Sequence, residues 1–589
     1  MMKHHLRAVP FRLIAPIFAL ALAVSPGVAQ VDSRFDLESG RSTANYPPPR
    51  HFDHLHMLLE IDIPDMDEPR LTARETLTLS SIGSRRWELR LDAVGLQVRA
   101  VERAGLPQSF THDGSVLRIT LDPPVEADEQ FQVTIDYALE YPLGNGLGLT
   151  WTAGNPDADS LTNRVPQIHS QGEPQLNSRW FACHDFPNES ATTEIVVTVD
   201  QAYQAIANGR LVYRSPNADG RVTWHWLQDK PHAYYLVSLV IGRFAEIDIG
   251  GDDSGRPGLP MTVFTPFGTE AHVAMTFRRT PDMIAYFEAL FDEPFPWDKY
   301  HQLIVRNFAA GAMENTSATT FATSFARTPL AMTEGIIAHE LTHQWFGDLV
   351  TCKSWEHLWL NEGWASYGEA LWAQASAEPG HEREAYLDTI AGFLRRQSAM
   401  NRSFVPTFPA MASNFYRDPQ LVFMKPDDVY SKGALVLHML HERLGDDAFW
   451  RGVRTYLDRY QYRQVETDDF RHVLEEVSGR SLQQFFDQWV HRPGLPRLRV
   501  DADYDAGALQ VAIEQTQLID ADNPAYAFSL PIRLVFADGS EQMIAIEVAG
   551  RSAGGSFPMP EPPERIEVNP DITVAAAVRT TYATPGEPR

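Results

Sequence analysis

The chain has 589 residues, of which 44% are hydrophobic, 22% charged and 11% aromatic. A chain of this length can bury several hydrophobic cores, so we expect three or four domains rather than one. Its formal net charge of −27 at pH 7 and the absence of a concentrated basic segment argue against a nucleic-acid partner, because nucleic acids are bound mainly by Lys and Arg.

Residues 1–29 have the pattern of a cleaved signal peptide. A basic segment with Lys3 and Arg7 precedes an apolar run at 13–24, and small residues at 27–29 suit a cleavage site. A membrane anchor is the alternative, but the apolar run is too short to span a bilayer. We therefore expect export to the periplasm or the medium, with no membrane attachment after cleavage.

Residues 30–243 have the alternating pattern of β-strands. Apolar residues stand at every second position in a run at 55–63 and in another at 131–139. A period of two, interrupted by Pro, Gly and Asp, is typical of half-buried strands. The pattern predicts a β-rich N-terminal domain.

The period changes to that of helices between about residues 333 and 490. Ile337, Leu341 and Trp345 are four residues apart, which places them on one face of a helix. A Pro-Gly-Leu-Pro cluster at 493–496 ends this pattern. We assign residues 244–495 to one domain that contains these helices.

Alternation returns beyond this cluster. Two alternating runs, at 532–536 and 544–548, flank an Asp-Gly pair at 538–539, which is a strong hairpin signal. We predict a small β-sandwich over residues 496–577 and a loose tail at 578–589. The fold class is therefore α+β with several domains.

The sequence contains only two cysteines, Cys183 and Cys352. An exported protein with two cysteines is not built on a disulfide framework. The two could form one disulfide, but we expect two buried free thiols.

The segment His339–His343 has the pattern HExxH. Residues four apart lie on one helix face, so both imidazoles can bind a single metal ion. Glu340 points too far round the helix to ligate with both histidines, but it can reach a water on the metal. The bare motif also arises by chance on surface helices, so a third ligand is needed to support the site.

Glu362 follows His343 with 18 residues between them, at the head of another helical stretch. A catalytic zinc needs three protein ligands and one open position. We predict that His339, His343 and Glu362 bind one Zn²⁺ per chain, although such a set also accepts other divalent metals. Glu369, two turns after Glu362, either orients a ligand or is a solvated helical acid.

At this point the sequence resembles a known family, the zinc aminopeptidases of the aminopeptidase N and leukotriene hydrolase type. The matching segments are QGEP at 171–174, GAMEN at 311–315, HELTHQWFGDLV at 339–350, WLNEGWASY at 359–367, VYSKGALVLHML at 429–440 and FFDQWVHRPGLP at 485–496. They occur in the family's order and cover nearly the whole chain after the signal segment. The resemblance implies a saddle-like β domain, a thermolysin-like catalytic domain and a small C-terminal β-sandwich.

The resemblance also implies roles for individual residues. Glu340 would be the general base, and Tyr430 would hydrogen-bond the scissile carbonyl. Glu173 and Glu314 would bind the free α-ammonium of the substrate. Gly311 and Ala312 would hold the peptide backbone. Gln171 and Met313 would be further substrate-binding residues. Taken alone, the two acids could be surface or loop carboxylates and the tyrosine a packed helix residue.

These observations favour a secreted zinc aminopeptidase that acts on peptides with a free N-terminus by metal-activated attack of water. One alternative is a zinc endopeptidase with the same core, which would have no use for Glu173 and Glu314. The other is a catalytically inactive peptide-binding relative, which would have lost a ligand, Glu340 or Tyr430. All of these residues are present. We expect peptide substrates as partners, and neither nucleic acid nor a membrane.

Overall fold

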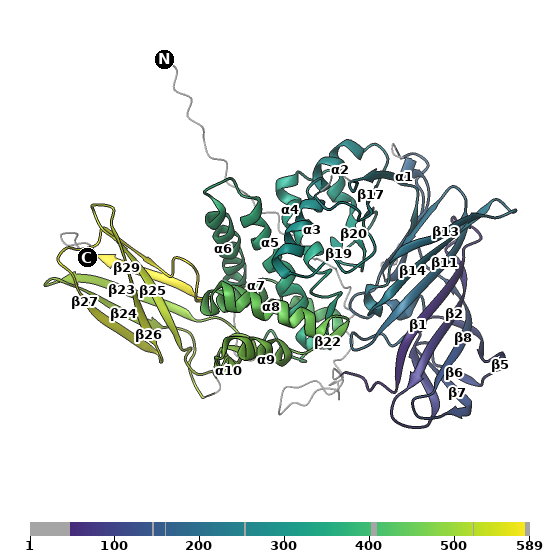
Figure 1. Cartoon of the computed structure of the whole chain (residues 1–589), viewed down its shortest axis with the longest axis horizontal. Coiled ribbons are helices and arrows are strands. Elements are labelled where there is room, and N and C mark those ends of the chain that lie inside the picture. Colours follow the sequence, from purple (N-terminus) through teal and green to yellow (C-terminus); the bar gives the residue numbers. More distant parts are fainter. Residues whose placement is uncertain are drawn as a thin grey trace, which may run out of the picture.

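The computed structural model describes residues 47–143, 147–158, 161–251, 255–401, 409–416, 418–521 and 523–583. Figure 1 shows three parts in a row: a β-rich N-terminal part, a mainly helical middle and a C-terminal β part. The predicted signal peptide lies outside the described residues. No described helix combines the length and the apolar character that a membrane crossing needs.

The N-terminal part is built on an eight-stranded sheet in the order β13-β14-β11-β1-β2-β8-β4-β5, beside the smaller sheets β12-β15-β10-β9 and β3-β7-β6. The alternation predicted for β8 is confirmed, because Val133, Ile135 and Tyr137 are buried. The elements are β1 (Phe52–Asp62), β2 (Arg70–Ser81), β3 (Arg86–Asp92), β4 (Gln97–Arg103), β5 (Leu106–Pro107), β6 (Phe110–His112), β7 (Val116–Val125), β8 (Gln130–Glu140), β9 (Gly148–Thr152), α1 (Leu161–Arg164), β10 (Gln167–Gln171), β11 (Ser190–Asp200), β12 (Gln204–Ala207), β13 (Arg210–Pro216), β14 (Arg221–Ala233) and β15 (Leu239–Gly242).

The middle part combines a five-stranded sheet, in the order β16-β17-β18-β20-β19, with a set of packed helices. Its elements are β16 (Ala245–Asp248), β17 (Met261–Thr265), α2 (Glu270–Phe277), α3 (Thr280–Phe291), β18 (Tyr300–Val305), β19 (Ala312–Met313), β20 (Ala318–Ala322), α4 (Leu330–Thr342), β21 (Val350–Cys352), α5 (Trp359–Ser376), α6 (Glu382–Met400), α7 (Ser431–Leu444), α8 (Asp446–Tyr460), β22 (Arg463–Val465), α9 (Thr467–Ser478) and α10 (Gln483–Trp489).

Two glycines bring α5 and α7 into close contact. A Cβ atom on Gly363 would lie 2.8 Å from Cα of Gly433, and a Cβ atom on Gly433 would lie 2.6 Å from Cα of Gly363. A real side chain at either position would force the helices apart, so glycine sets their separation. This contact holds the start of α7, where Tyr430 lies, beside the first turn of α5, which carries Glu362.

The C-terminal part is a sandwich of a four-stranded sheet, β27-β24-β23-β29, and a three-stranded sheet, β26-β25-β28. The predicted hairpin is confirmed, because β25 and β26 pair antiparallel across the turn at 538–539. The strands are β23 (Arg497–Asp505), β24 (Ala508–Gln515), β25 (Phe528–Val535), β26 (Glu541–Val548), β27 (Ser552–Pro558), β28 (Arg565–Val568) and β29 (Ala577–Ala583).

The prediction of a loose tail at 578–589 is wrong for residues 578–583, which belong to β29. This strand pairs in parallel with β23, and Val578 and Tyr582 pack against the hydrophobic core. The prolines and glycine that indicated a loose tail fall in residues 584–589, outside the described part of the chain. The alternating apolar residues before them therefore decide the local structure.

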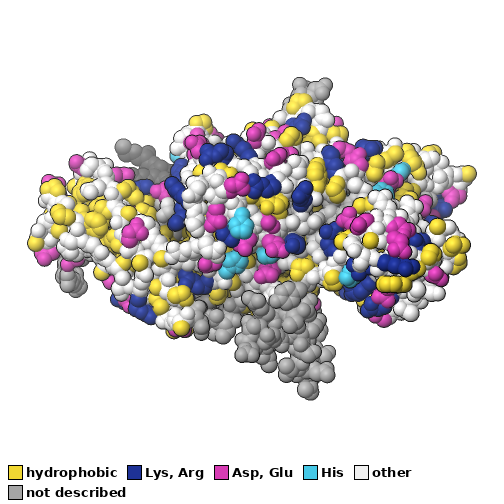
Figure 2. All heavy atoms as spheres, turned by 60° about the horizontal axis from the view of Figure 1, so that its bottom comes forward, with side chains coloured by type: hydrophobic (Ala, Val, Ile, Leu, Met, Phe, Trp, Pro, Cys, Tyr) yellow, Lys and Arg dark blue, Asp and Glu magenta, His cyan; other side chains and the backbone are white. Residues whose placement is uncertain are grey.

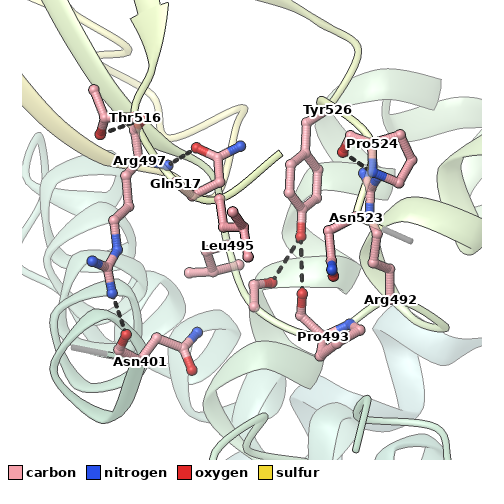
Figure 3. A pocket seen from close by; sticks show the side chains of 12 residues that line it. Asn401, Arg492, Pro493, Leu495, Arg497, Thr516, Gln517, Asn523, Pro524 and Tyr526 are labelled. Carbon is pink, nitrogen blue, oxygen red and sulfur yellow. Dashed lines mark hydrogen bonds between the residues drawn. The ribbon is translucent and has the colours of Figure 1, made fainter. Parts of the chain in front are cut away.

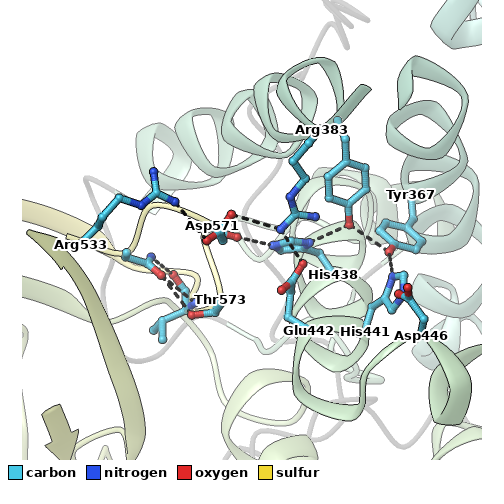
Figure 4. A network of polar contacts seen from close by, with 12 residues as sticks. Tyr367, Arg383, His438, His441, Glu442, Asp446, Arg533, Asp571 and Thr573 are labelled. Atoms are coloured by element: carbon cyan, nitrogen blue, oxygen red, sulfur yellow. Dashed lines mark hydrogen bonds and ion pairs between the residues drawn. The ribbon is translucent and has the colours of Figure 1, made fainter. Parts of the chain in front are cut away.

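A chain of polar contacts joins the sandwich to the helices (Figure 4). Arg383 of α6 donates to Glu442 of α7 at 2.8 Å and to the Asp571 carboxylate at 3.3 Å. His438 of α7 contacts the backbone oxygen of Asp571 at 2.9 Å through Nε2 and the hydroxyl of Tyr386 at 2.7 Å through Nδ1. The sandwich is therefore tied to α6 and α7, and Tyr430 lies at the start of α7.

The two cysteines are far apart in sequence and both are buried free thiols, as we expected. Burial raises the pKa of each thiol well above its usual value. Both therefore stay protonated at neutral pH and act as small packing residues. On the face drawn in Figure 2, acidic and basic side chains are interspersed over the surface.

Candidate metal centre and substrate site

Three potential metal ligands converge at the contact of α4 and α5. Their ligand atoms all lie within 4.8 Å of one another, and all three residues are buried: His339, His343 and Glu362. The Glu362 Oε2 atom lies 3.3 Å from Nε2 of His339 and 3.2 Å from Nε2 of His343. Two imidazoles and one carboxylate at this spacing match the donor set of a catalytic zinc site.

The other ring nitrogen of each histidine is held by a neighbour. Nδ1 of His339 lies 3.0 Å from Oε1 of Glu369, and Nδ1 of His343 lies 3.1 Å from the backbone oxygen of Phe346. Both contacts favour the tautomer with the proton on Nδ1, which leaves Nε2 free to bind a metal. Of the two readings of Glu369 that the sequence leaves open, the structure supports the one in which it orients a ligand.

Glu362 is prepared to act as an anionic ligand. Burial disfavours its charged form, but the charges of His343 and His339 and their hydrogen bonds outweigh burial and lower its pKa. The carboxylate is therefore ionised over the whole neutral range.

Glu340 lies beside the ligands without joining them. It is only 6% exposed, and burial raises its pKa to about 8, against the opposing charges of His339 and His343. A carboxylate with a pKa near neutrality can both accept and release a proton under working conditions. Its position next to His339 in α4 suits a base for a water at the metal centre.

Tyr430 packs directly on this centre. Its ring is stacked on that of His339, with centroids 5.9 Å apart and planes inclined by 22°. Burial, together with the negative charge of Glu362, raises its pKa well above the usual value. The hydroxyl therefore keeps its proton and can donate a hydrogen bond in the site.

Two further acids reach the same region from distant parts of the chain. Glu314 directly follows β19, and its Oε1 atom lies 4.0 Å from Nδ1 of His343. Glu173 follows β10, and burial together with the charge of Glu314 raises its pKa well above the usual value. Gln171, at the end of β10, lies 3.5 Å from the Met313 sulfur and so joins the two segments.

The backbone at Gly311 and Ala312 forms an edge of the central sheet. Ala312 begins β19, which is the last strand in the sheet order and pairs with β20. Gly311 has φ +87°, a left-handed conformation that favours glycine. An edge strand can pair with an extended peptide, so this segment can hold a substrate main chain.

Sequence reasoning missed Gln344, which directly follows the second histidine. Its Nε2 donates to the backbone oxygen of Glu314 at 2.8 Å, and its Oε1 accepts from the backbone nitrogen of Ser317 at 2.9 Å. Gln344 thereby fixes the loop that carries Glu314 to the helix that carries the histidines. Its adjacency to His343 was the one available signal, and the contact itself depends on tertiary structure.

Comparison with known proteins agrees with this geometry. Residues 49–236 match the profile of the peptidase M1 N-terminal domain, and residues 275–489 match that of the peptidase family M1 domain. The candidate ligands all lie in the second match.

Curated relatives carry aminopeptidase names. Aminopeptidase N of Streptomyces lividans is 30% identical over 348 residues, which are 58% of this chain and 39% of that protein. Probable aminopeptidase 1 of Sulfurisphaera tokodaii is 28% identical over 453 residues, 75% of this chain and 54% of the relative. Aminopeptidase A of Gloydius brevicauda is 26% identical over 553 residues, which are 90% of this chain and 55% of that protein. The chain spans about half the length of the curated relatives it matches. By its two matched domains, this chain is a member of peptidase family M1.

Proposed function

We propose that the protein is a zinc aminopeptidase that removes single residues from the free N-terminus of peptides. Support comes from the family membership, the aminopeptidase names of the relatives and the donor set formed by His339, His343 and Glu362. The decisive observation for an exopeptidase is the pair of buried carboxylates, Glu173 and Glu314.

Among the described residues, the one ion-pair contact to either of these carboxylates is that of His343 with Glu314, at 4.0 Å. The Oε1 atom of each is buried without a hydrogen-bond partner, and among the described residues neither Glu173 nor Glu314 forms an ion pair with Lys or Arg. Burying carboxylates in this way is costly unless a cation is supplied. The α-ammonium of a peptide is such a cation, and it would lie next to the metal ligands.

The donor set fits zinc, because two imidazoles and one carboxylate converge on one point. When bound, zinc supplies a Lewis acid that lowers the pKa of a water toward neutrality and polarises a carbonyl. Glu340 accepts the proton of the attacking water and later delivers it to the leaving amine.

The remaining residues hold and orient the substrate. The Tyr430 hydroxyl donates to the carbonyl oxygen as negative charge develops on it. Glu173 and Glu314 hold the ammonium so that only the first peptide bond reaches the reacting atoms. The edge strand at Gly311 and Ala312 pairs with the substrate backbone.

The rival proposals make different use of the same residues. A zinc endopeptidase would gain nothing from two buried carboxylates beside its metal ligands. An inactive peptide-binding relative would not need a base with a pKa of about 8 beside the metal ligands, as Glu340 has. The aminopeptidase proposal gives both features a role.

The test compares matched peptides with free and N-acetylated amino termini. We expect cleavage of the free peptides alone, loss of activity with a chelator and recovery with zinc. Glu314→Gln should lower kcat/KM on free peptides at least tenfold while zinc content stays at one per chain, because a charge-assisted contact is lost. Equal cleavage of acetylated and free peptides would sink the aminopeptidase proposal and favour an endopeptidase. No cleavage of either by the zinc-loaded protein would favour an inactive relative.

We further propose that the protein is exported and cleaved near residue 29, on the basis of the N-terminal sequence pattern. N-terminal sequencing of the protein from the periplasm or the medium tests this. An intact N-terminus on cytoplasmic protein would contradict it.

A further inference from the structure

Glu173 and Glu314 stand on segments that belong to different parts of the chain. Glu173 follows β10 in the N-terminal part, and Glu314 follows β19 in the middle part. Recognition of one α-ammonium by both carboxylates requires that the two segments be held at a fixed separation. The contacts that set this separation therefore bear directly on substrate recognition.

The segment that carries Glu173 lies against residues 234–237. The Asn177 side chain donates to two backbone oxygens in that stretch, at 2.5 and 3.2 Å. A Cβ atom on Gly172 would lie 2.2 Å from the backbone oxygen of Tyr235, so the two backbones are in direct contact. The position of Glu173 is therefore fixed relative to this stretch.

Asn208, in the turn between β12 and β13, connects the same stretch to the segment that carries Glu314. Its Nδ2 atom donates to the backbone oxygen of Leu236 at 3.0 Å and to that of Thr316 at 2.7 Å. Its Oδ1 atom accepts from the backbone nitrogen of Ser238 at 2.7 Å. Asn208 is 2% exposed, which shields these bonds from water. Because Thr316 is only two residues beyond Glu314, one side-chain amide spans the two segments.

A second set of contacts fastens this turn to the loop at 314–317. The backbone nitrogen of Gly209 donates to the Ser317 hydroxyl at 2.8 Å. The ammonium of the buried Lys299 donates to the backbone oxygen of Ala207 at 2.9 Å and to that of Ser317 at 3.3 Å. Three successive residues of the turn therefore contribute to the position of the loop.

Full use of the amide is not general among the buried asparagines of this chain. Neither Nδ2 nor Oδ1 of Asn401 has a hydrogen-bond partner, and the bond drawn to this residue in Figure 3 goes from Arg497 to its backbone oxygen. Asn208 instead uses two donor hydrogens and one acceptor oxygen. An ionised carboxylate has no hydrogen to donate and a hydroxyl has only one, so neither could replace this amide.

We infer that Asn208 is a positioning residue for recognition of the substrate α-ammonium. It holds Glu173 and Glu314 at the separation at which both carboxylates can bind the same amine. The inference rests on the proposed aminopeptidase function, and it assigns to a residue of the N-terminal part the alignment of the two acids. Preorganised carboxylates bind a cation more tightly than carboxylates that must first be brought together.

The test measures recognition of the amine by binding and not by turnover. Isothermal titration calorimetry of the zinc-loaded protein compares L-alanine hydroxamate with propionohydroxamate, which is the same molecule without the amine. Both probes bind zinc through the hydroxamate group, so the ratio of their Kd values reports the contribution of the amine. We expect the wild type to prefer alanine hydroxamate roughly a hundredfold, because two charge-assisted contacts hold its ammonium.

Asn208→Ala should lower this preference about tenfold, because the two carboxylates no longer meet at one point. Its zinc content and its Kd for propionohydroxamate should stay at the wild-type values, which a general loss of stability would not leave unchanged. The matched control is Asn188→Ala, which should keep the wild-type preference. Asn188 is 5% exposed, and its amide joins Pro48 and His184 in the same N-terminal part of the chain.

Lys299→Met is measured in place of Asn208→Ala if that variant does not fold. It removes the hydrogen bonds of the ammonium but keeps an apolar chain beside Trp226, and it should lower the preference about three- to tenfold. A folded variant that keeps the full preference would overturn the inference and leave the proposed function standing. An equal loss of affinity for both probes would also overturn it, because Asn208 would then only stabilise the fold. Equal Kd values of the wild type for the two probes would contradict the proposed function, and the inference with it.

Discussion

The Nδ1 atom of His339 lies 3.0 Å from Oε1 of Glu369, although the two residues are 30 positions apart and belong to different helices. The contact crosses the interface of α4 and α5, where the metal ligands also meet. Because the proton on Nδ1 is engaged by Glu369, the Nε2 lone pair of His339 is directed at the ligand set. The rotamer and tautomer of this ligand are therefore fixed by a residue that does not itself belong to the set.

Glu369→Gln should weaken metal binding without removing a ligand. An amide accepts a weaker hydrogen bond than a carboxylate does, so we expect zinc affinity to fall about 10–100-fold, as is usual when such a supporting contact is lost. Competition with a chromogenic chelator measures this. The exposed Glu378→Gln is the matched control and should bind zinc as the wild type does. Equal affinities for all three proteins would show that Glu369 does not support the centre.

Glu340→Gln separates metal binding from proton transfer. The variant keeps both histidines and Glu362, so we expect zinc content to stay at one per chain. It cannot take a proton from water, so kcat should fall by at least about 10²-fold. Metal analysis and steady-state kinetics on one preparation measure the zinc content and kcat. A variant with wild-type kcat would remove Glu340 from the mechanism.

Tyr430→Phe removes one hydroxyl and keeps the ring stacked on His339. We expect kcat to fall by roughly 10²–10³, the usual effect of losing one donor to a developing oxyanion. KM should change little, because the bond strengthens only in the transition state. The opposite result, a raised KM with kcat preserved, would mean that Tyr430 only positions the substrate.

Local patterns in the sequence were sufficient to predict much of the fold and the candidate metal ligands. The alternation in β8 and the spacing of His339 and His343 each depend on one element, whose period fixes which residues share a face. Glu362 could be added because a third ligand is a chemical requirement. The strand β18 was missed because it is buried on both faces between parallel neighbours, so its sequence does not alternate.

Tertiary contacts could not be predicted in the same way. Gln344 acts on residues of another segment, and the sequence around it does not specify those contacts. The spacing of Glu369 from Glu362 made a contact with a ligand one of two readings, and only the tertiary structure decides between them. In β1, a bulge between His54 and His56 changes the register, so the buried face runs through His54 while Leu55 is partly exposed. Such shifts follow from the pairing of strands and not from the strand's own composition.

Glu75, in β2, gives a prediction for stability against pH. It is fully buried, its Oε2 accepts from the backbone nitrogen of Ala182 at 2.8 Å, and burial raises its pKa to about 8. Above the ordinary pKa of a glutamate, the unfolded state releases the proton of Glu75 while the folded state keeps it. The contribution of Glu75 to stability is therefore lost as pH rises toward 8. Glu75→Gln cannot ionise and should escape that loss. We expect the Tm of the variant, measured relative to that of the wild type, to increase from pH 5 to pH 8. A difference in Tm that does not change with pH would contradict the raised pKa of Glu75.

The last prediction concerns Gln344, which holds the loop that carries Glu314. Gln344→Glu keeps an oxygen that can accept from Ser317 but cannot donate to the backbone oxygen of Glu314. Leaving that buried oxygen unpaired costs about 1–3 kcal/mol, and the added carboxylate repels the loop. Glu314 should therefore lose its position while the metal ligands keep theirs, so kcat/KM on free-amine peptides should fall about ten- to a hundredfold. Zinc content should remain at one per chain, and exposed Gln374→Glu on α5 should behave as the wild type. Loss of zinc from the Gln344→Glu protein would show instead that Gln344 supports the metal centre, and unchanged kinetics would show that the loop is held by other contacts.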